Sequence, residues 1–597
     1  MWLYREARFG RQTLAPSLAA LRNQKLKLKA VILGSIPKIG GVNMDFPSRS
    51  RVRAFSLFVA AACTFSSVAV AQEKPGDKGG EGKAPAASTV AAPDSTTEGT
   101  VTIGGQAVAY RAVAGTITVG ANDQQDATLA FDGSLLPDSG VKAATDPAEA
   151  PPTARIFYVA YFRKDTSDET HRPVTFIYNG GPGSATMWLH MGTFGPKRIV
   201  LPDVDHQEGA PYNVVSNQYS LLDASDLVFI DAPGTGFSRT FGKERGKAFY
   251  GIDQDGQAFS HFIRKFLTKY GRWNSPKYLF GESYGTPRSA VLSADLGGVD
   301  LNGIILLSQI LSFDNSIDEP TRNPGVDQAY ALALPTYAAT AWYFHKLANP
   351  PAELQPLLEE VQKYALGDYM AGLLKGSELS DSEKQAVAEK LHGYTGLPVD
   401  YLLRANLRVT GGDFSKELKL DDDTTIGRLD TRYQGPSVNP LSEGSEYDPQ
   451  SDAITSGWLA AINGYLRQDL KYGLQETYFP SGRMGGDFNW DMHHNPPGFG
   501  RGGGGDWSGP NVMPDLAYRM KMNPKMKVML AGGYFDLATP YFEGEFEMHH
   551  LPMPEKLQSN ISYHYYEAGH MIYVKEDVLK QFHSDVESFI HSTENGQ

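Results

Sequence analysis

Short apolar runs alternate with longer amphipathic stretches through the first half of the chain. The runs are bounded by Gly, Pro, Asn or Asp, which is typical of buried strands in a parallel sheet. They lie at residues 155–162, 173–178, 226–231, 278–280 and 301–308. Residues 254–270 have apolar positions at helical spacing, and a second helical stretch follows residue 285. This alternation of strand and helix predicts an α/β sheet.

The pattern changes twice outside this region. Residues 100–130 contain short apolar alternations separated by Gly, which predict β-hairpins. Residues 316–480 are mostly helix-like, with one β-like break near residues 425–434, and we interpret them as an inserted helical cap. The sheet resumes at 527–532 and 561–566. The predicted divisions are a leader (1–71), a flexible linker (72–98), the first part of the core (99–315), the cap (316–480) and the second part of the core (481–597).

The N-terminal region has the features of a secretory signal peptide. Arg49, Arg51 and Arg53 precede an apolar run at residues 54–62, and small residues continue to Ala71. We expect cleavage before Gln72 and export to the periplasm or the medium. The apolar run is too short to span a bilayer, so no stable membrane insertion is expected after cleavage. The pattern assigns no role to residues 1–43, because Met44 fits the natural start of this signal.

Composition narrows the class of protein. Of the 597 residues, 41% are hydrophobic and 21% are charged, as in an ordinary globular protein. The net charge of −13 argues against a nucleic-acid partner. The only cysteine, Cys63, lies in the leader, so the exported chain would have no disulfide. This favours a large bacterial periplasmic protein over a eukaryotic secreted one.

The sequence Gly-Glu-Ser-Tyr-Gly at residues 281–285 carries the first chemical signal. It follows the apolar run at 278–280 and precedes a helical stretch, which is the context of the nucleophile elbow in an α/β-hydrolase fold. The turn would hold the Ser283 hydroxyl at the tip of a strand. A plain Gly-rich turn is the alternative. The fold class we predict is α/β, an α/β-hydrolase with a mainly helical cap insertion.

A serine nucleophile needs a base and an orienting carboxylate, and this fold places them in the order Ser, acid, His. Asp536 follows the apolar run at 528–533, and His570 follows the strand at 561–566. Asp536 could instead cap a turn or helix, and His570 could be a surface residue. His549 and His550 compete for the role of base but fall on a predicted helix. His493 and His494 lack companions at metal-ligand spacing, so neither a metal nor a cofactor is expected.

Acyl transfer also needs two backbone N–H donors for an oxyanion. The residue after the nucleophile, Tyr284, should supply one. The Gly-rich turn at residues 179–184, Asn-Gly-Gly-Pro-Gly-Ser, follows a predicted strand and should supply the other. An ordinary Gly/Pro turn is again the alternative.

Four motifs together resemble the serine carboxypeptidase family. They are Asn-Gly-Gly-Pro-Gly-Ser at 179–184, Asp-Ala-Pro-Gly-Thr-Gly-Phe-Ser at 231–238, Gly-Glu-Ser-Tyr-Gly at 281–285 and Gly-His-Met at 569–571. The resemblance implies a catalytic triad, two oxyanion donors and two residues that bind the terminal carboxylate of the substrate. The triad would be Ser283, Asp536 and His570. The oxyanion donors would be Gly181 and Tyr284, and the residues that bind the carboxylate would be Asn179 and Glu282. For Glu282 to bind an anion it must hold a proton, so we expect an acidic optimum for peptide hydrolysis.

The chain departs from the family at two positions. Ile177 stands where typical members have Trp, and Thr193 stands where a second glutamate usually lies. We expect catalysis to survive, whereas strict exopeptidase specificity is left open. The function predicted is therefore a secreted serine carboxypeptidase acting on peptides. An acyltransferase or esterase on the same scaffold is the first alternative, and a non-catalytic binding module is the second. The sequence leaves the oligomeric state open, including a homodimer.

Overall fold

The computed structural model describes residues 92–166, 168–497 and 510–594. The predicted leader (1–71) and most of the predicted linker lie outside these ranges. The predicted linker (72–98) ends too late in the chain, because strand β1 (Ser95–Ile103) begins before its predicted end. β1 pairs along its whole length with β2 (Gln106–Gly120), with Ser95 opposite Ala114. Backbone hydrogen bonding in the ladder orders a segment whose composition alone suggests a tether.

Ten strands of the described residues form one mixed sheet, in the order β1-β2-β3-β7-β4-β9-β10-β13-β14, with the short β8 (Arg239–Phe241) beside β3. Pairing is antiparallel from β1 to β7 and parallel from β7 to β14. The remaining strands are β3 (Thr153–Arg163), β4 (Val174–Tyr178), β7 (Asp226–Ile230), β9 (Lys277–Glu282), β10 (Gly303–Leu307), β13 (Lys527–Gly533) and β14 (Ile561–Tyr566). This is the α/β-hydrolase fold predicted from the sequence.

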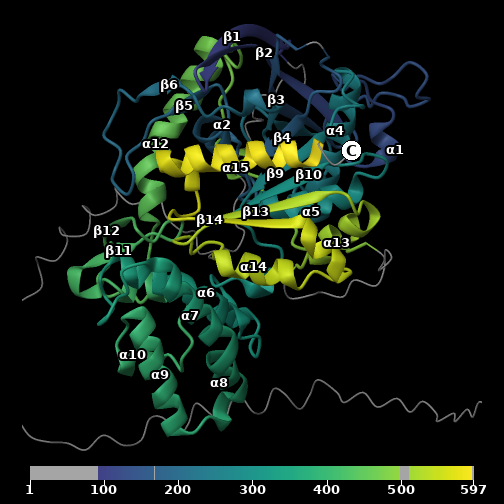
Figure 1. Cartoon of the computed structure of the whole chain (residues 1–597). Helices are drawn as coiled ribbons and strands as arrows, with labels where there is room; N and C mark the ends of the chain where they lie inside the picture. The colour runs from purple at the N-terminus through teal and green to yellow at the C-terminus, as the bar shows by residue number, and fades with distance from the viewer. Residues whose placement is uncertain (1–91, 167, 498–509, 595–597) are drawn as a thin grey trace, which may run out of the picture. The chain divides into compact units, whose positions relative to one another are not determined.

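Helices cover both faces of the sheet (Figure 1). Successive side chains of a strand point to opposite faces, so in β9 Phe280 joins one apolar cluster and Leu279 the other. On the first face lie α2 (Met187–Gly192), α12 (Pro449–Gly464) and α15 (Glu576–Glu594). On the second face lie α4 (Ile252–Lys269), α5 (Gly285–Asp295) and α13 (Met513–Met522). Among the described residues, no helix is long and apolar enough to cross a membrane.

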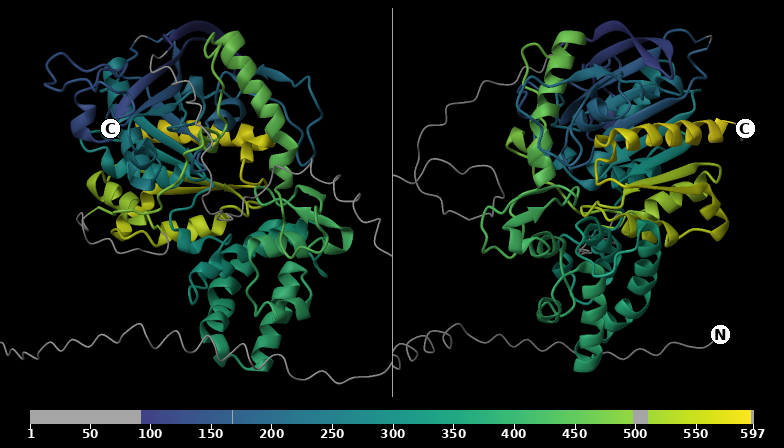
Figure 2. Two further views of the ribbon diagram at one scale, coloured as in Figure 1. Left: turned by 180° about the vertical axis from the view of Figure 1, so that it is seen from behind. Right: turned by 60° about the vertical axis from the view of Figure 1, so that its left-hand side comes forward.

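The predicted cap at residues 316–480 is smaller than expected. A third apolar cluster joins the helices of its first part, which lie together away from α12 in both views of Figure 2. These are α6 (Gln328–Tyr343), α7 (Leu354–Tyr364), α8 (Met370–Lys375), α9 (Asp381–Thr395), α10 (Val399–Arg404) and α11 (Gly411–Glu417). The predicted β-like break is the hairpin of β11 (Thr424–Ile426) and β12 (Gln434–Pro436). Helix α12 belongs to the core instead, because Ile454, Trp458 and Ile462 are buried with the sheet.

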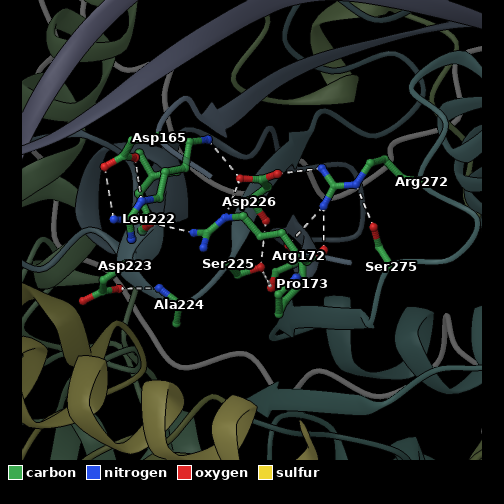
Figure 3. Close-up of polar contacts among 12 residues, drawn as sticks. Asp165, Arg172, Pro173, Leu222, Asp223, Ala224, Ser225, Asp226, Arg272 and Ser275 are labelled. Atoms are coloured by element: carbon green, nitrogen blue, oxygen red, sulfur yellow. Dashed lines mark hydrogen bonds and ion pairs between the residues drawn. The ribbon is translucent and has the colours of Figure 1, made fainter. Parts of the chain in front are cut away.

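A buried ion cluster fastens the amino ends of the strands (Figure 3). Asp226, the first residue of β7, is 1% exposed. Its carboxylate accepts hydrogen bonds from Arg172 Nε at 2.9 Å, Arg272 Nη1 at 2.6 Å and the Arg163 backbone N–H at 3.0 Å. These partners come from the segment before β4, the segment before β9 and the end of β3. The cluster thus ties four neighbouring strands, β3, β7, β4 and β9, together at the end of the sheet opposite the predicted elbow.

Candidate active site

Ser283 lies on a tight turn between β9 and α5, as the elbow motif predicts. Its φ angle is +59°, a left-handed conformation that is uncommon for a residue with a side chain. The Ser283 N–H donates to the Leu307 carbonyl at 3.0 Å, which fixes the turn against the end of β10. A side chain on Gly281 would overlap the Gly285 carbonyl, so the turn needs glycine there. The hydroxyl of this half-buried serine therefore sits at the carboxyl end of the sheet.

Asp536 and His570 form a hydrogen-bonded pair. His570 Nδ1 lies 2.8 Å from Asp536 Oδ2, and both residues are buried. The other carboxylate oxygen, Oδ1, accepts from the backbone N–H groups of Ala538 at 2.9 Å and Thr539 at 3.0 Å. The Thr539 hydroxyl also donates to Oδ2 at 2.8 Å. These bonds hold the Asp536 side chain where it can fix the imidazole tautomer and orientation.

The backbone brings the pair to the elbow. Ser308, directly after β10, donates its hydroxyl to the His570 carbonyl at 2.8 Å, and the preceding residue, Leu307, accepts from the Ser283 N–H. The hydrogen bonds of the described residues include none between the Ser283 hydroxyl and the His570 ring. Catalytic contacts of this kind are often long without substrate.

The charges around His570 favour its protonated form. Burial lowers the pKa of the imidazole, but the Asp536 carboxylate and the more distant Glu282 outweigh it, so the pKa of His570 is raised above 6.5. A base with this environment can stabilise the positive charge that it gains on taking a proton from a serine hydroxyl.

The Gly-rich turn meets the elbow backbone. A side chain on Gly180 would overlap the Tyr284 backbone nitrogen, so only glycine allows this approach. Gly181, with φ +112°, follows it. Among the hydrogen bonds of the described residues, none uses the backbone N–H of Gly181 or of Tyr284. The two groups predicted as oxyanion donors therefore come from touching turns and are available to a ligand.

Glu282 and Asn179 are in contact behind the nucleophile. Asn179 Nδ2 donates to Glu282 Oε2 at 3.0 Å, and Asn179 Oδ1 accepts from the Leu189 N–H at 3.0 Å. Burial raises the pKa of Glu282 to about 7, while nearby His570, Tyr573 and Asn179 oppose the rise. A carboxyl group with this pKa is largely protonated in mild acid and can then donate a hydrogen bond to an anion.

Sequence reasoning missed Tyr573. Its hydroxyl donates to Glu282 Oε2 at 2.9 Å, the same oxygen that Asn179 bonds. Its ring lies against Gly192, where an added Cβ would come within 2.7 Å of it, beside the position of the missing glutamate. Thr193 itself is buried and donates to the Leu189 carbonyl at 2.6 Å. The only sequence signal was a tyrosine three residues after the proposed base, and no motif pointed to it.

The histidines considered as alternatives have other surroundings. His549 and His550 are exposed at the end of α14 (Tyr541–His549). His494 lies between two carboxylates, with Nδ1 2.6 Å from Asp253 and Nε2 2.8 Å from Asp515. In the described ranges, one group could hold a metal ion: Asp223, His583 and Glu587, whose ligand atoms lie within 4.8 Å of one another. Asp223 precedes β7, so this group lies at the amino edge of the sheet, away from Ser283.

Comparison with known proteins identifies the family of the elbow region. Residues 147–292 match the family model described as serine carboxypeptidase. This segment is thus similar to the serine carboxypeptidases. Serine carboxypeptidase-like 2 of Arabidopsis thaliana is 31% identical over 134 residues, which are 22% of this chain and 28% of that protein. The pheromone-processing carboxypeptidase KEX1 of Saccharomyces cerevisiae is 31% identical over 116 residues, which are 19% of this chain and 15% of that protein.

The matched segment contains the two turns and Ser283 but ends before Asp536 and His570. The pairwise matches span less than a third of the length of these two relatives. Among solved structures, the prohormone-processing carboxypeptidase KEX1(delta)p of Saccharomyces cerevisiae covers 80% of this chain and 91% of its own, at 13% identity and a TM-score of 0.44. A proline iminopeptidase of Mycobacterium smegmatis covers 74% of this chain and 96% of its own, at 13% identity and a TM-score of 0.31. The α/β-hydrolase assignment rests on the strand order and the elbow, and not on these two structural similarities.

Proposed function

We propose that this protein is an exported serine carboxypeptidase that removes C-terminal residues from peptides. Ser283 Oγ attacks the carbonyl carbon of the last peptide bond, and His570 Nε2 takes the hydroxyl proton. The N–H groups of Gly181 and Tyr284 stabilise the oxyanion. His570 then gives the proton to the leaving amine, and an acyl-enzyme on Ser283 remains. A water molecule, deprotonated by His570, hydrolyses that ester.

The observation that carries the proposal is the carboxyl site next to the nucleophile. Glu282 precedes Ser283 in the chain, and Asn179 precedes the oxyanion turn, yet the two side chains are hydrogen-bonded to each other. A substrate carboxylate bound there lies one residue from the carbonyl that faces the oxyanion donors. This spacing selects the last peptide bond. An internal bond lacks the charged group and would leave the polar site unfilled.

Protonation of Glu282 makes this recognition possible. An ionised Glu282 would repel a substrate carboxylate, whereas the neutral acid donates a hydrogen bond to it. The approaching anion adds to the effect of burial and raises the pKa of Glu282 further in the complex. The Asn179 amide and the Tyr573 hydroxyl are neutral donors that do not depend on pH in this range. The three groups together can bind a carboxylate without a fixed cation.

An acyltransferase or esterase is the second candidate, and Thr193 is the observation that favours it. The glutamate that usually lies at this position is absent, so one acidic partner of Glu282 is replaced by Tyr573. The acyl-enzyme would be the same, with an alcohol in place of water as the acceptor. Product analysis in the presence of an alcohol distinguishes the two functions.

The deciding experiment uses one peptide as the free acid and as the C-terminal amide. Residues 72–597 are incubated with each form between pH 4 and 8, and mass spectrometry follows the products, with Ser283→Ala as the control. We expect stepwise loss of terminal residues from the free acid alone, at acidic pH. Equal cleavage of both forms would show that the carboxyl site does not select the substrate. No cleavage by a protein whose Ser283 still reacts with a fluorophosphonate would favour acyl transfer to another acceptor.

Export is part of the proposal. The basic, apolar and small-residue order of residues 49–71 supports a cleaved signal peptide, and the expected mature N-terminus is Gln72. N-terminal sequencing of protein recovered from the periplasm or the medium tests this directly. An N-terminus upstream of residue 72 in that fraction would contradict it.

A further inference from the structure

The proposed acid and base are joined by a loop from the cap. Residues 427–431 form the first part of the connection from β11 to β12 and run between the segment of Asp536 and the segment of His570. The His570 N–H donates to the Leu429 carbonyl at 2.6 Å. The Leu537 N–H donates to the Arg428 carbonyl at 3.0 Å, and the Thr431 N–H donates to the Phe535 carbonyl at 2.9 Å. The loop thus bonds both neighbours of Asp536 and the backbone of His570 itself.

Close packing accompanies these bonds. A side chain on Gly569, the residue before His570, would overlap Asp430 of the loop. Asp430 is 1% exposed and pairs with Arg432 Nη2 at 2.6 Å, so it has little freedom to move away. The Thr431 hydroxyl lies 2.6 Å from the Thr340 hydroxyl of α6, which links the loop to the main helix of the cap. A displacement of the loop would therefore displace the His570 backbone.

Asp448 holds this loop in place. Its Oδ2 accepts from the backbone N–H groups of Arg428 at 2.7 Å and Leu429 at 2.9 Å. Its Oδ1 accepts from the Ser451 N–H at 2.6 Å, which makes Asp448 the N-cap of α12. Since α12 packs on the sheet, the carboxylate connects the loop to the core. The same two residues that it binds present the carbonyls bonded by Leu537 and His570.

We propose that Asp448 is a positioning residue for the acid–base pair, acting through residues 427–431 to set the alignment of His570 with Asp536. The core supplies the carboxylate and the imidazole, and the cap loop fixes their positions relative to each other. Neither Asp448 nor the loop touches the reacting atoms. The inference rests on the proposed roles of Asp536 and His570 but not on the choice between peptide and ester substrates.

The experiment compares Asp448→Ala and Asp448→Asn with Thr410→Ala in the full exported chain. Asparagine still caps a helix but replaces one acceptor oxygen by an amide, so it is the second variant if alanine fails to fold. Thr410 caps α11 in the cap through the Asp413 N–H at 3.3 Å and is the matched control. Two readouts are recorded. They are the far-downfield proton resonance of His570 Nδ1–H, assigned by its loss in His570→Gln, and kcat and KM for a small activated ester.

We expect the resonance to shift or broaden in the Asp448 variants and kcat to fall by on the order of ten- to a hundredfold, with KM little changed, because a displaced base is misaligned for proton transfer. Thr410→Ala should match the wild type in both readouts. A wild-type resonance and kcat in the folded Asp448 variants would overturn the proposal. If the wild type shows the resonance but no ester or peptide hydrolysis, the proposed function fails, while the shift in the Asp448 variants still reports on positioning.

Discussion

Tyr573 Oη lies 2.9 Å from Glu282 Oε2 and shares that oxygen with the Asn179 amide at 3.0 Å. Two neutral donors therefore converge on one oxygen of a buried carboxyl group. The three residues come from the segment after β14, the elbow and the Gly-rich turn, which the sheet brings together. This relationship determines how the proposed carboxyl site should respond to mutation and to pH.

Removing the Tyr573 hydroxyl should weaken selection of free-acid peptides. In Tyr573→Phe, Glu282 loses one donor and the substrate carboxylate loses a neighbouring O–H. We expect kcat/KM for free-acid peptides to fall by on the order of tenfold, as for the loss of one hydrogen bond to a charged group. Hydrolysis of a neutral ester should change little. Tyr369→Phe is the matched control, since Tyr369 donates to the Leu407 carbonyl inside the cap. Equal losses for both substrates in Tyr573→Phe would mean a structural role.

The rate on free-acid peptides should fall as pH rises past the pKa of Glu282. That pKa is about 7, and only the neutral form of Glu282 can donate a hydrogen bond to a substrate carboxylate. We expect kcat/KM for the free acid to decrease above pH 7 and kcat/KM for a small neutral ester to lack this decrease. Glu282→Gln should remove the decrease, because glutamine stays neutral. Activity on free-acid peptides that keeps rising above neutral pH would contradict the carboxyl-site assignment.

Glu282 should also make stability depend on pH. Its folded-state pKa of about 7 exceeds the unfolded value of 4.5, so the folded state binds more protons between these values. Below pH 4.5 the ionisation of Glu282 therefore does not lower the free energy of unfolding. As pH rises toward 7, this ionisation lowers the free energy of unfolding increasingly. We expect Glu282→Gln to raise the free energy of unfolding by roughly 1–3 kcal/mol at pH 8 relative to its effect at pH 4.5. Urea unfolding at the two pH values measures the difference, and an equal effect at both would refute it.

Replacing the Asp536 carboxylate should remove most of the activity while leaving the fold intact. In Asp536→Asn the amide cannot hold the same imidazole tautomer, and we expect kcat to fall on the order of 10⁴-fold. The matched control is Asp585→Asn, because Asp585 faces another histidine, His564, at 3.5 Å. Fluorophosphonate labelling of Ser283 should slow in the first variant and not in the second. Full labelling speed in Asp536→Asn would remove this residue from the triad.

The Asp226 cluster should matter for stability and not for chemistry. In Arg272→Met the buried Asp226 loses its partner at 2.6 Å. An uncompensated buried charge costs about 3–5 kcal/mol, although Arg172 remains to offset part of it. We expect a lower urea midpoint with kcat preserved under folding conditions. Arg264→Met, at a partly exposed ion pair, is the control. A large loss of kcat in folded Arg272→Met would show coupling across the sheet.

The sequence determined the strands, the two glycine turns and the order of the candidate residues. Each depends on local pattern: apolar runs predict buried strands, and a serine between glycines after such a run predicts an elbow. Asp536 and His570 were found because they follow the last two strands of the sheet, and parallel strands bring their carboxyl ends to one edge.

Only the tertiary structure decided the contacts between segments distant in sequence. Tyr573 reaches Glu282 across 291 residues, and nothing near either residue marks the pair. Helix α12 has the same helical pattern as the cap, but burial of Trp458 with the sheet assigns it to the core. The loop at residues 427–431 contains no motif, yet its backbone bonds the segments of the proposed acid and base. Backbone carbonyls and side-chain packing carry these relationships, and they depend on how the chain is brought together in space.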